Sequence, residues 1–128
     1  MKLSEFKNKL DNREFLNDNS KEMWDCAYKW QEQANKEDNL IKWSWDCGLK
    51  LDYDGDVCRI SSRFYPPHKS SDEYGKYHGT ITVMIGDAIE DIHKHELEAN
   101  TLDELQKLAE DYVSKILNKM QNAIRAVF

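Results

Sequence analysis

Three histidines form the most specific candidate for metal chemistry in this chain. His93 and His95 are separated by one residue, so in a β-strand both side chains would lie on the same face. If residues 91–99 are a strand that returns from the preceding strand through a two-residue turn, His78 lies opposite His95. Imidazoles grouped in this way suit zinc or another divalent cation. The sequence therefore offers a metal site at His78, His93 and His95, with a solvated polar segment as the alternative.

Other polar residues suggest anion or cation binding less specifically. Arg59 and Arg63, with Ser61 between them, would share one strand face and could hold a phosphate or a carboxylate. Cross-strand ion pairs on a wet sheet face are the simpler interpretation. Residues 52–56 resemble a calcium loop in their acidic residues, but the glycine is fourth rather than sixth, and a hairpin turn explains them.

The motifs of common enzyme classes are missing from the sequence. It contains no Gly-x-Ser-x-Gly elbow, no phosphate loop, no Cys-x-x-Cys and no dinucleotide fingerprint. The sequence therefore favours a non-enzymatic protein that binds no cofactor. An active site assembled only by the fold stays open as an alternative, and a metal-dependent hydrolase using the histidines is the form we consider.

Acidic side chains are concentrated in the last third of the chain. Nine Asp and Glu residues lie between Asp87 and Asp111, against two lysines, in a protein with a formal net charge of −6. Such a field repels nucleic-acid phosphates and attracts basic partners. We therefore expect a protein partner, such as a basic nucleic-acid-handling protein, and no direct contact with nucleic acid. The predicted contact residues are Asp91, Glu96, Glu98, Asp103, Glu104, Arg59 and Arg63.

Length and composition predict a single domain, residues 1–128, with a core of its own. No apolar run is long enough for a membrane span, and the first residues show no secretory signal, so we expect a cytoplasmic protein without a membrane partner. Three cysteines argue against a disulfide framework. Together these features fit a small inhibitor, adaptor or immunity protein, of the kind that phages and mobile elements encode.

The elements that would position these residues begin with a conspicuous alternation. Residues 42–53 alternate polar and apolar without a break, which predicts one half-buried strand of twelve residues. Asp54-Gly55 follows, and this dipeptide favours a type I′ hairpin turn. That turn would place Trp45 opposite Phe64 and would put the apolar residues of both strands on one face.

The remaining elements complete an α+β fold. Apolar spacing predicts two helices before the alternating strand, then strands at 57–65 and 77–85. Residues 91–99 are predicted as a strand, with a short helix as the alternative. Thr101–Glu104 forms a capping box at the start of a final helix of about 26 residues. We predict a two-layer sandwich, in which an antiparallel meander of three or four strands carries the N-terminal helices and the long C-terminal helix on one face.

The apolar C-terminal end of the last helix has two possible packing partners. It can cover the N-terminal helices, which we favour, or it can pair with a second copy of the chain in a homodimer. The residues concerned are Ile116, Met120, Ile124, Val127 and Phe128.

Overall fold

A computed structural model describes residues 2–12, 21–35, 41–45, 48–55, 58–67, 76–85 and 92–127; of Ile85, Ile92, His93 and residues 121–127 it describes the backbone alone. Two helices come first, and a third ends the chain. The elements are α1 (Leu3–Asp11), α2 (Lys21–Ala34), β1 (Ile41–Trp45), β2 (Leu49–Asp54), β3 (Cys58–Tyr65), β4 (Tyr77–Ile85), β5 (Ile92–Ala99) and α3 (Leu102–Val127).

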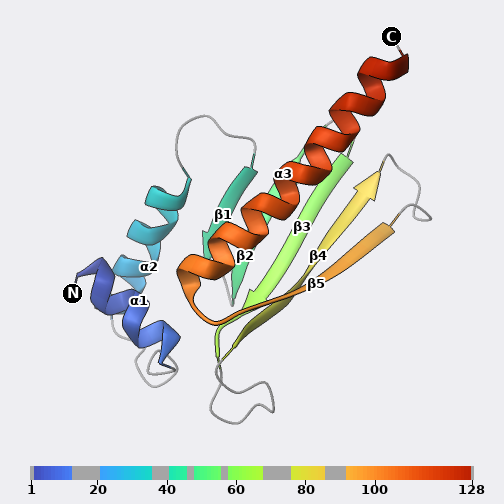
Figure 1. The fold of residues 1–128 in the computed structure, drawn as a ribbon. Helices are drawn as coiled ribbons and strands as arrows, with labels where there is room; N and C mark the ends of the chain where they lie inside the picture. Colours follow the sequence, from blue (N-terminus) through green and yellow to red (C-terminus); the bar gives the residue numbers. More distant parts are fainter. Residues whose placement is uncertain are drawn as a thin grey trace.

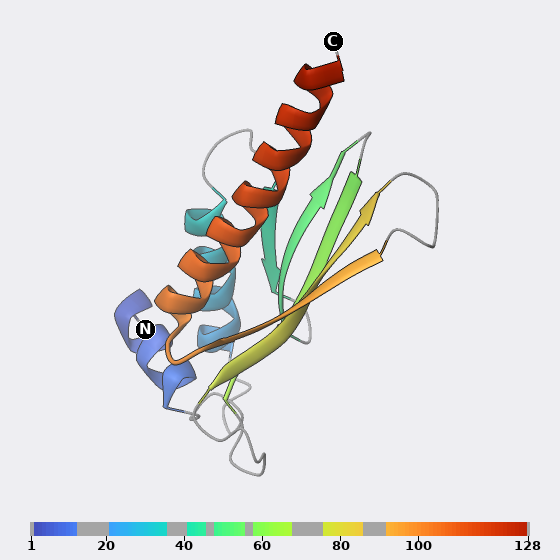
Figure 2. The same ribbon diagram turned by 45° about the vertical axis from the view of Figure 1, so that its right-hand side comes forward.

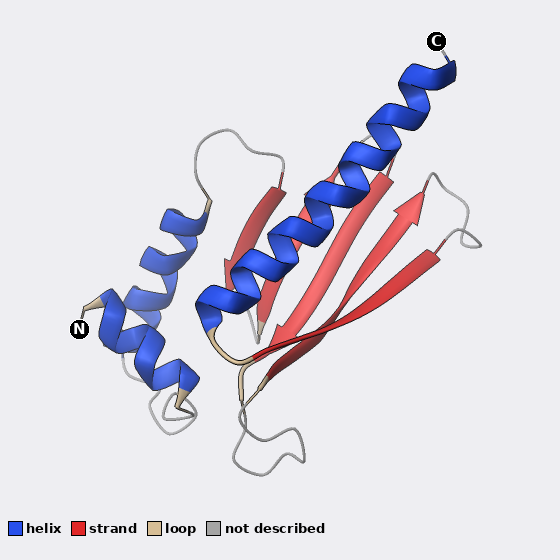
Figure 3. Cartoon of the chain, in the orientation of Figure 1, coloured by secondary structure: helices blue, strands red, loops and turns tan. Residues whose placement is uncertain are grey.

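The strands form one antiparallel sheet in which each strand pairs with its neighbour in the chain. All three helices lie on one face of this sheet (Figure 1; Figure 3), and the turned view separates the two layers (Figure 2). The predicted α+β sandwich is therefore confirmed, with five strands rather than three or four.

The alternating stretch 42–53 is a hairpin and not one strand, so that prediction is wrong. Trp45 pairs with Leu49 and Trp43 with Leu51, and the chain reverses between them. Three residues separate Trp45 from Leu49, so paired residues of the two strands are both odd-numbered or both even-numbered. The polar–apolar alternation therefore continues unchanged through the turn. Gly48, in this loop, has a φ of 155°, a backbone conformation that residues with a side chain rarely adopt. The faces assigned to the tryptophans are nevertheless correct.

Strands β2 and β3 pair four residues away from the predicted register. Leu49, rather than Trp45, lies opposite Phe64. Asp54 pairs with Arg59, and the Gly55 N–H donates to the Cys58 carbonyl at 3.1 Å, so the chain turns beyond Gly55. Because the shift is an even number of residues, each side chain keeps its predicted face.

Strand β5 confirms the strand predicted at 91–99, but in a register three residues away from the expected one. His95 lies opposite Ile81, and His78 lies opposite Glu98. An odd shift turns every side chain of the strand to the other face. His95 therefore projects on the helix-covered side, where its ring stacks on Tyr112 with centroids 4.0 Å apart. His78 projects on the opposite side.

The core lies between the helices and the covered face of the sheet. Aromatic rings dominate it, since Trp43 contacts both Trp30 and Phe64 at centroid distances of 5.5 and 6.1 Å. Along β3 the side chains alternate strictly between buried and exposed. Buried residues of α3 recur at helical spacing; they are Leu102, Leu105, Ala109 and Val113. Cys26 and Cys58 are buried free thiols, and Cys47 lies outside the described residues.

Helix α2 closes the outer edge of the sheet at β1. Asn35 accepts from the Trp43 N–H at 2.5 Å and donates to the Trp43 carbonyl at 2.7 Å. One turn earlier, Gln31 accepts from the Trp45 N–H at 3.0 Å. An exposed strand edge would present these backbone groups to other chains, and the two amide side chains satisfy them instead.

Helix α3 begins at the predicted capping residues. The Glu104 N–H donates to Thr101 Oγ1 at 3.2 Å, and the Glu104 carboxylate accepts from the Asn100 N–H at 3.2 Å. The C-terminal turns of α3 extend past the strands and away from α1 and α2 (Figures 1 and 2). The favoured prediction that this end covers the N-terminal helices is therefore wrong. Ile116 and Met120 pack against the core, and a homodimer through the far end stays a prediction.

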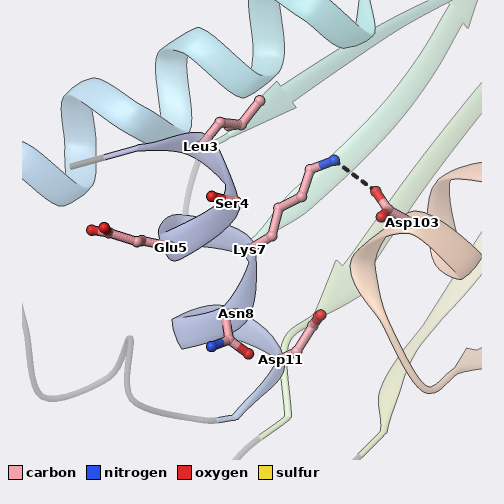
Figure 4. Close-up of a pocket in the computed structure, with 7 residues that line it drawn as sticks. All are labelled: Leu3, Ser4, Glu5, Lys7, Asn8, Asp11 and Asp103. Atoms are coloured by element: carbon pink, nitrogen blue, oxygen red, sulfur yellow. Dashed lines mark hydrogen bonds and ion pairs between the residues drawn. The ribbon is translucent and has the colours of Figure 1, made fainter.

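A polar contact joins the end of α1 to both β4 and α3. The Asp11 carboxylate accepts from the Tyr77 hydroxyl at 2.5 Å and from the Leu102 N–H at 2.9 Å. Burial of the Tyr77 ring, with the hydrogen bond to Asp11 and the nearby negative charge, raises the pKa of Tyr77 well above its ordinary value. Beside it, Lys7 pairs with Asp103 at 2.8 Å (Figure 4). We call these contacts the Asp11 junction.

Candidate functional site

One face of the sheet is covered by helices, and we call it the covered face. The strands present mainly polar side chains on the other face, which we call the open face. It consists of Lys42, Ser44, Lys50, Asp52, Asp54, Arg59, Ser61, Arg63, Tyr65, His78, Thr80, Thr82, Met84, Lys94, Glu96 and Glu98. All of these residues are exposed or half-buried.

Strand pairing groups four of the seven predicted contact residues on the open face. Arg63 lies opposite Thr80, and Thr80 lies opposite Glu96, so a base and an acid flank a central hydroxyl. Arg59 and Glu98 lie on the same face of β3 and β5. The predicted register of β5 puts Glu96 and Glu98 on the covered side, and the observed register brings them to the face of Arg59 and Arg63.

Two shallow depressions meet on the open face. The first, of about 280 Å³, lies over β3, β4 and β5. The open-face side chains around it are Arg63, Tyr65, His78, Thr80, Glu96 and Glu98. The second, of about 460 Å³, lies over β2, β3 and β4 and is lined by Lys50, Asp52, Ser61, Ser62, Arg63, Thr80 and Thr82. Arg63 and Thr80 belong to both, so they stand at the centre of the surface.

Some charges of the open face are paired within the protein and others are available. Arg59 Nε lies 3.2 Å from Asp54 Oδ1, and Lys76 Nζ lies 3.5 Å from Glu98 Oε2. Exposed pairs of this kind contribute little to stability. Within the described part of the chain, the side chains of Arg63 and Glu96 make no ion pair or hydrogen bond, so their charges are available to a ligand or a partner.

The other predicted contact residues lie elsewhere. Asp103 and Glu104 are in the first turn of α3, in the helical layer, where Lys7 pairs with Asp103 and Glu104 caps the helix. A third depression, of about 630 Å³, lies there between α1 and the start of α3 (Figure 4). Asp91 lies outside the described residues. The predicted acidic patch is thus divided between two layers.

The acidity of the chain also divides unevenly between the described residues and the rest. The described residues include fifteen of the eighteen Lys and Arg and thirteen of the twenty-four Asp and Glu. The remaining segments therefore hold three basic and eleven acidic residues, which accounts for the negative net charge. The open face itself carries both signs: β3 presents two arginines, whereas β2 and β5 each present one lysine and two acids.

The histidine site predicted from sequence loses its geometric basis. The register of β4 and β5 puts His78 and His95 on opposite faces of the sheet, so these two imidazoles cannot share an ion. The side chain of His93 is not among those described. Across the described residues, no group of three His, Cys, Asp or Glu side chains is placed to hold a metal ion.

Sequence reasoning missed the partners that surround Arg63. The predicted register, with Trp45 opposite Phe64, puts Lys50 opposite Arg59, whereas the observed register puts Lys50 opposite Arg63. Sequence reasoning also gave Thr80 no role, although Thr80 is shared by both depressions. The complementary pair Asp54–Arg59 is a signal that could have favoured the correct register, because opposite charges facing each other on neighbouring strands are stabilising.

Comparison of the chain with protein-family models, with curated proteins and with solved structures found no match. Among the described helices, none is both long and apolar enough to span a membrane. Function must therefore be inferred from the geometry and charge of the open face.

Proposed function

We propose that this chain is a small non-enzymatic protein-binding domain that docks its partner on the open face of the sheet. The observation that carries the proposal is the contrast between the two sides of the same strands, since one is packed with aromatics and the other carries mixed charges around Arg63. Arginine and tyrosine are enriched at protein interfaces. Tyr65, 42% exposed, lies on the same strand face as Arg63.

Two features favour binding over catalysis. The depressions of the open face are shallow, whereas small-molecule active sites are concave and bury most of their ligand. Catalytic groups usually have shifted pKa values. Burial raises the pKa of Cys58 and of Tyr77, and both groups lie on the covered side of the sheet rather than on the open face.

The charge of the open face suggests the chemistry of the partner. Glu96 and Glu98 line one end of the face, so basic groups of the partner would meet the protein at β5. The negative charge of the whole chain would accelerate the approach of a basic protein. We propose a cytoplasmic inhibitor, adaptor or immunity protein, encoded by a phage or mobile element and directed at a basic nucleic-acid-handling protein. Asp103 and Glu104 would contribute at the periphery.

The test compares two double variants of equal charge. Glu96→Lys with Glu98→Lys changes the open face, and Glu22→Lys with Asp25→Lys makes the same change on the exposed side of α2. Immobilised wild-type chain is used to isolate a partner from the native cell, and association kinetics are then measured for all three proteins. We expect the open-face variant to associate on the order of tenfold more slowly, with a weaker salt dependence.

The α2 variant separates contact from long-range attraction. It should retain most of the wild-type rate, because the same change of net charge is made on α2, away from the open face. Equal losses in both variants, or no loss in either, would contradict docking through the open face. If no isolated protein binds the wild-type chain and the open-face variant differently, docking through the open face is also contradicted.

A further inference from the structure

We infer that the outer edge of β5 pairs with the same edge of a second copy of the chain, so that two five-stranded sheets join into one. The pairing is antiparallel and centred on His95, with Lys94 of each copy opposite Glu96 of the other. This inference goes beyond the proposed docking function and does not depend on it. An added strand lies in the plane of the sheet and leaves the open face accessible.

The two edges of the sheet differ in how their backbone groups are bonded. β1 and β5 are the outermost strands (Figure 1). At β1, the side chains of Asn35 and Gln31 bond the backbone of Trp43 and Trp45. Among the described residues, neither a side chain nor a further backbone group bonds the outer edge of β5. This edge, eight residues long and without proline or glycine, can therefore accept another strand.

The charges of β5 favour a second copy as that strand. Lys94, His95 and Glu96 are exposed, and within the described part of the chain Lys94 and Glu96 make no ion pair. In an antiparallel pair centred on His95, each Lys94 lies opposite Glu96 of the second copy, which gives two pairs of opposite charge. The surface is then complementary to itself, as a two-fold symmetric interface requires.

Other registers of the same two strands are less favourable. A shift of two residues places either Glu96 opposite Glu96 or Lys94 opposite Lys94, and like charges in directly opposite positions destabilise a sheet. A shift of one residue would place the covered-face residues of one copy among the open-face residues of the other. The register centred on His95 avoids both problems, and it keeps the helices of the two copies on the same side of the joined sheet.

An exposed apolar side chain lies beside this edge in the helical layer. Leu108, 39% exposed, is one turn before Tyr112, whose ring stacks on His95. Glu110, on the other side of α3, accepts from the Trp43 indole on β1, so Leu108 and Tyr112 face the β5 edge. Side chains that an added strand presents on the covered face would lie against Leu108 and reduce its exposure.

Charge reversal on β5 tests the pairing, with the dissociation constant measured by sedimentation. We expect wild type to form dimers that dissociate on dilution. Lys94→Glu and Glu96→Lys each put like charges opposite each other at two positions, so each should raise the dissociation constant at least about tenfold. The double variant exchanges the two charges and should return to within about threefold of wild type. A mixture of the two single variants should form a heterodimer, because one chain then carries two acids at these positions and the other carries two lysines.

Glu98→Lys is the matched control, because it makes the same change of charge on the same face of β5, and Glu98 lies opposite Ile92 in the proposed register. It should leave the dissociation constant within about threefold of wild type. Equal weakening by Glu98→Lys and Glu96→Lys would reduce the effect to net charge and overturn the pairing.

Hydrogen exchange of the wild-type chain tests the edge without any substitution. The amides of β5 should exchange more slowly as the protein concentration rises, whereas those of β1 should not change. A wild type that stays monomeric at every concentration would overturn the inference. So would a dimer that charge reversal on β5 leaves unchanged, which would assign the contact to another surface, such as the C-terminal end of α3.

Discussion

The two faces of the five-stranded sheet come from the same strands in alternation, yet they are under different constraints. On the covered face, residues such as Trp43, Leu51 and Phe64 are at most 2% exposed, and the rings of Trp43 and Phe64 contact each other. On the open face, Arg59, Ser61 and Arg63 are exposed and contact no helix. Packing therefore explains the residue types of one face, whereas those of the other are exposed to solvent and are not constrained by packing.

This contrast predicts a ranking of substitutions by their effect on stability. Changes on the covered face should be costly, because the interior cannot fill a lost volume or admit an added one. Changes on the open face should cost little and should be felt in binding instead.

Trp43→Ala should lower the free energy of unfolding by about 3–5 kcal/mol. The substitution removes a 2% exposed ring that packs between Trp30 and Phe64, and it leaves Glu110 without the indole N–H that donates to it at 2.9 Å. Urea denaturation followed by circular dichroism measures the change. Trp24→Ala, at a ring that is 37% exposed, should cost less than half as much. Equal losses of unfolding free energy in Trp43→Ala and Trp24→Ala would contradict the expected difference between a buried and a partly exposed ring.

Gly79→Ala should lower the free energy of unfolding by about 1–3 kcal/mol. A methyl group at Gly79 would overlap the backbone carbonyl of Arg63 and the ring of Phe64, so β3 or β4 must move. Because Arg63 stands at the centre of the open face, this covered-face substitution should also shift the Arg63 amide in NMR spectra. Thr80→Ala, the next residue, is the control and should leave stability within about 0.5 kcal/mol. A Gly79→Ala protein as stable as wild type would contradict the prediction.

Alkaline pH should destabilise the protein through the covered face. The pKa of Tyr77 is raised by burial and by Asp11, so above pH 10.0, the ordinary value, the unfolded chain loses a proton that the folded chain keeps. Unfolding is then linked to proton release, and the free energy of unfolding falls as the pH rises. The raised pKa of Cys58 adds to the fall from its ordinary value of 9.0.

Denaturant midpoints measured from pH 7 to pH 11 test this linkage. Tyr77→Phe should be less stable at neutral pH, because it loses the hydrogen bond to Asp11, and should show a shallower decline above pH 10. Tyr65→Phe changes the same residue type on the open face and should keep the wild-type slope. If the stability of Tyr77→Phe declines with pH above pH 10 as steeply as that of wild type, the deprotonation of Tyr77 is not the cause of the decline.

Arg59→Gln should have the smallest effect. It removes the exposed ion pair with Asp54 and should lower the free energy of unfolding by a few tenths of a kcal/mol, about the value of such pairs. The loss should shrink at high salt, which screens the pair, and urea denaturation at low and high salt measures it. A loss above about 1 kcal/mol would show that the open face also serves the fold.

The covered face could be predicted from the sequence because burial imposes a visible period on it. The alternation in 42–53 assigned Trp43 and Trp45 to the core correctly, and the helical spacing and capping box located α3. The same alternation concealed the turn between β1 and β2, because a loop of three residues keeps odd-numbered residues on one face and even-numbered residues on the other. A pattern of period two reports the face of each residue and does not report where a strand ends.

The open face could be predicted only as far as the registers were correct. An error of four residues between β2 and β3 kept Arg59 and Arg63 on their face but gave Arg63 the wrong neighbour. An error of three residues between β4 and β5 moved His95 to the covered side and removed the metal site. Polar side chains in solvent have many acceptable neighbours, so the even shift between β2 and β3 carries no packing penalty. The odd shift at β5 does carry one, because the predicted register puts Leu97 on the open face and Glu96 on the covered face.

The Asp11 junction has a consequence for the order of folding. Each strand pairs with its neighbour in the chain, so the sheet can assemble through short loops. Asp11 reaches Leu102 across 91 residues and Lys7 reaches Asp103 across 96, and closing such long loops costs more chain entropy. The sheet and α3 would therefore form first, and α1 would dock last. In the native protein, α1 would be the first helix to open, so it could detach and return while the sheet stays intact.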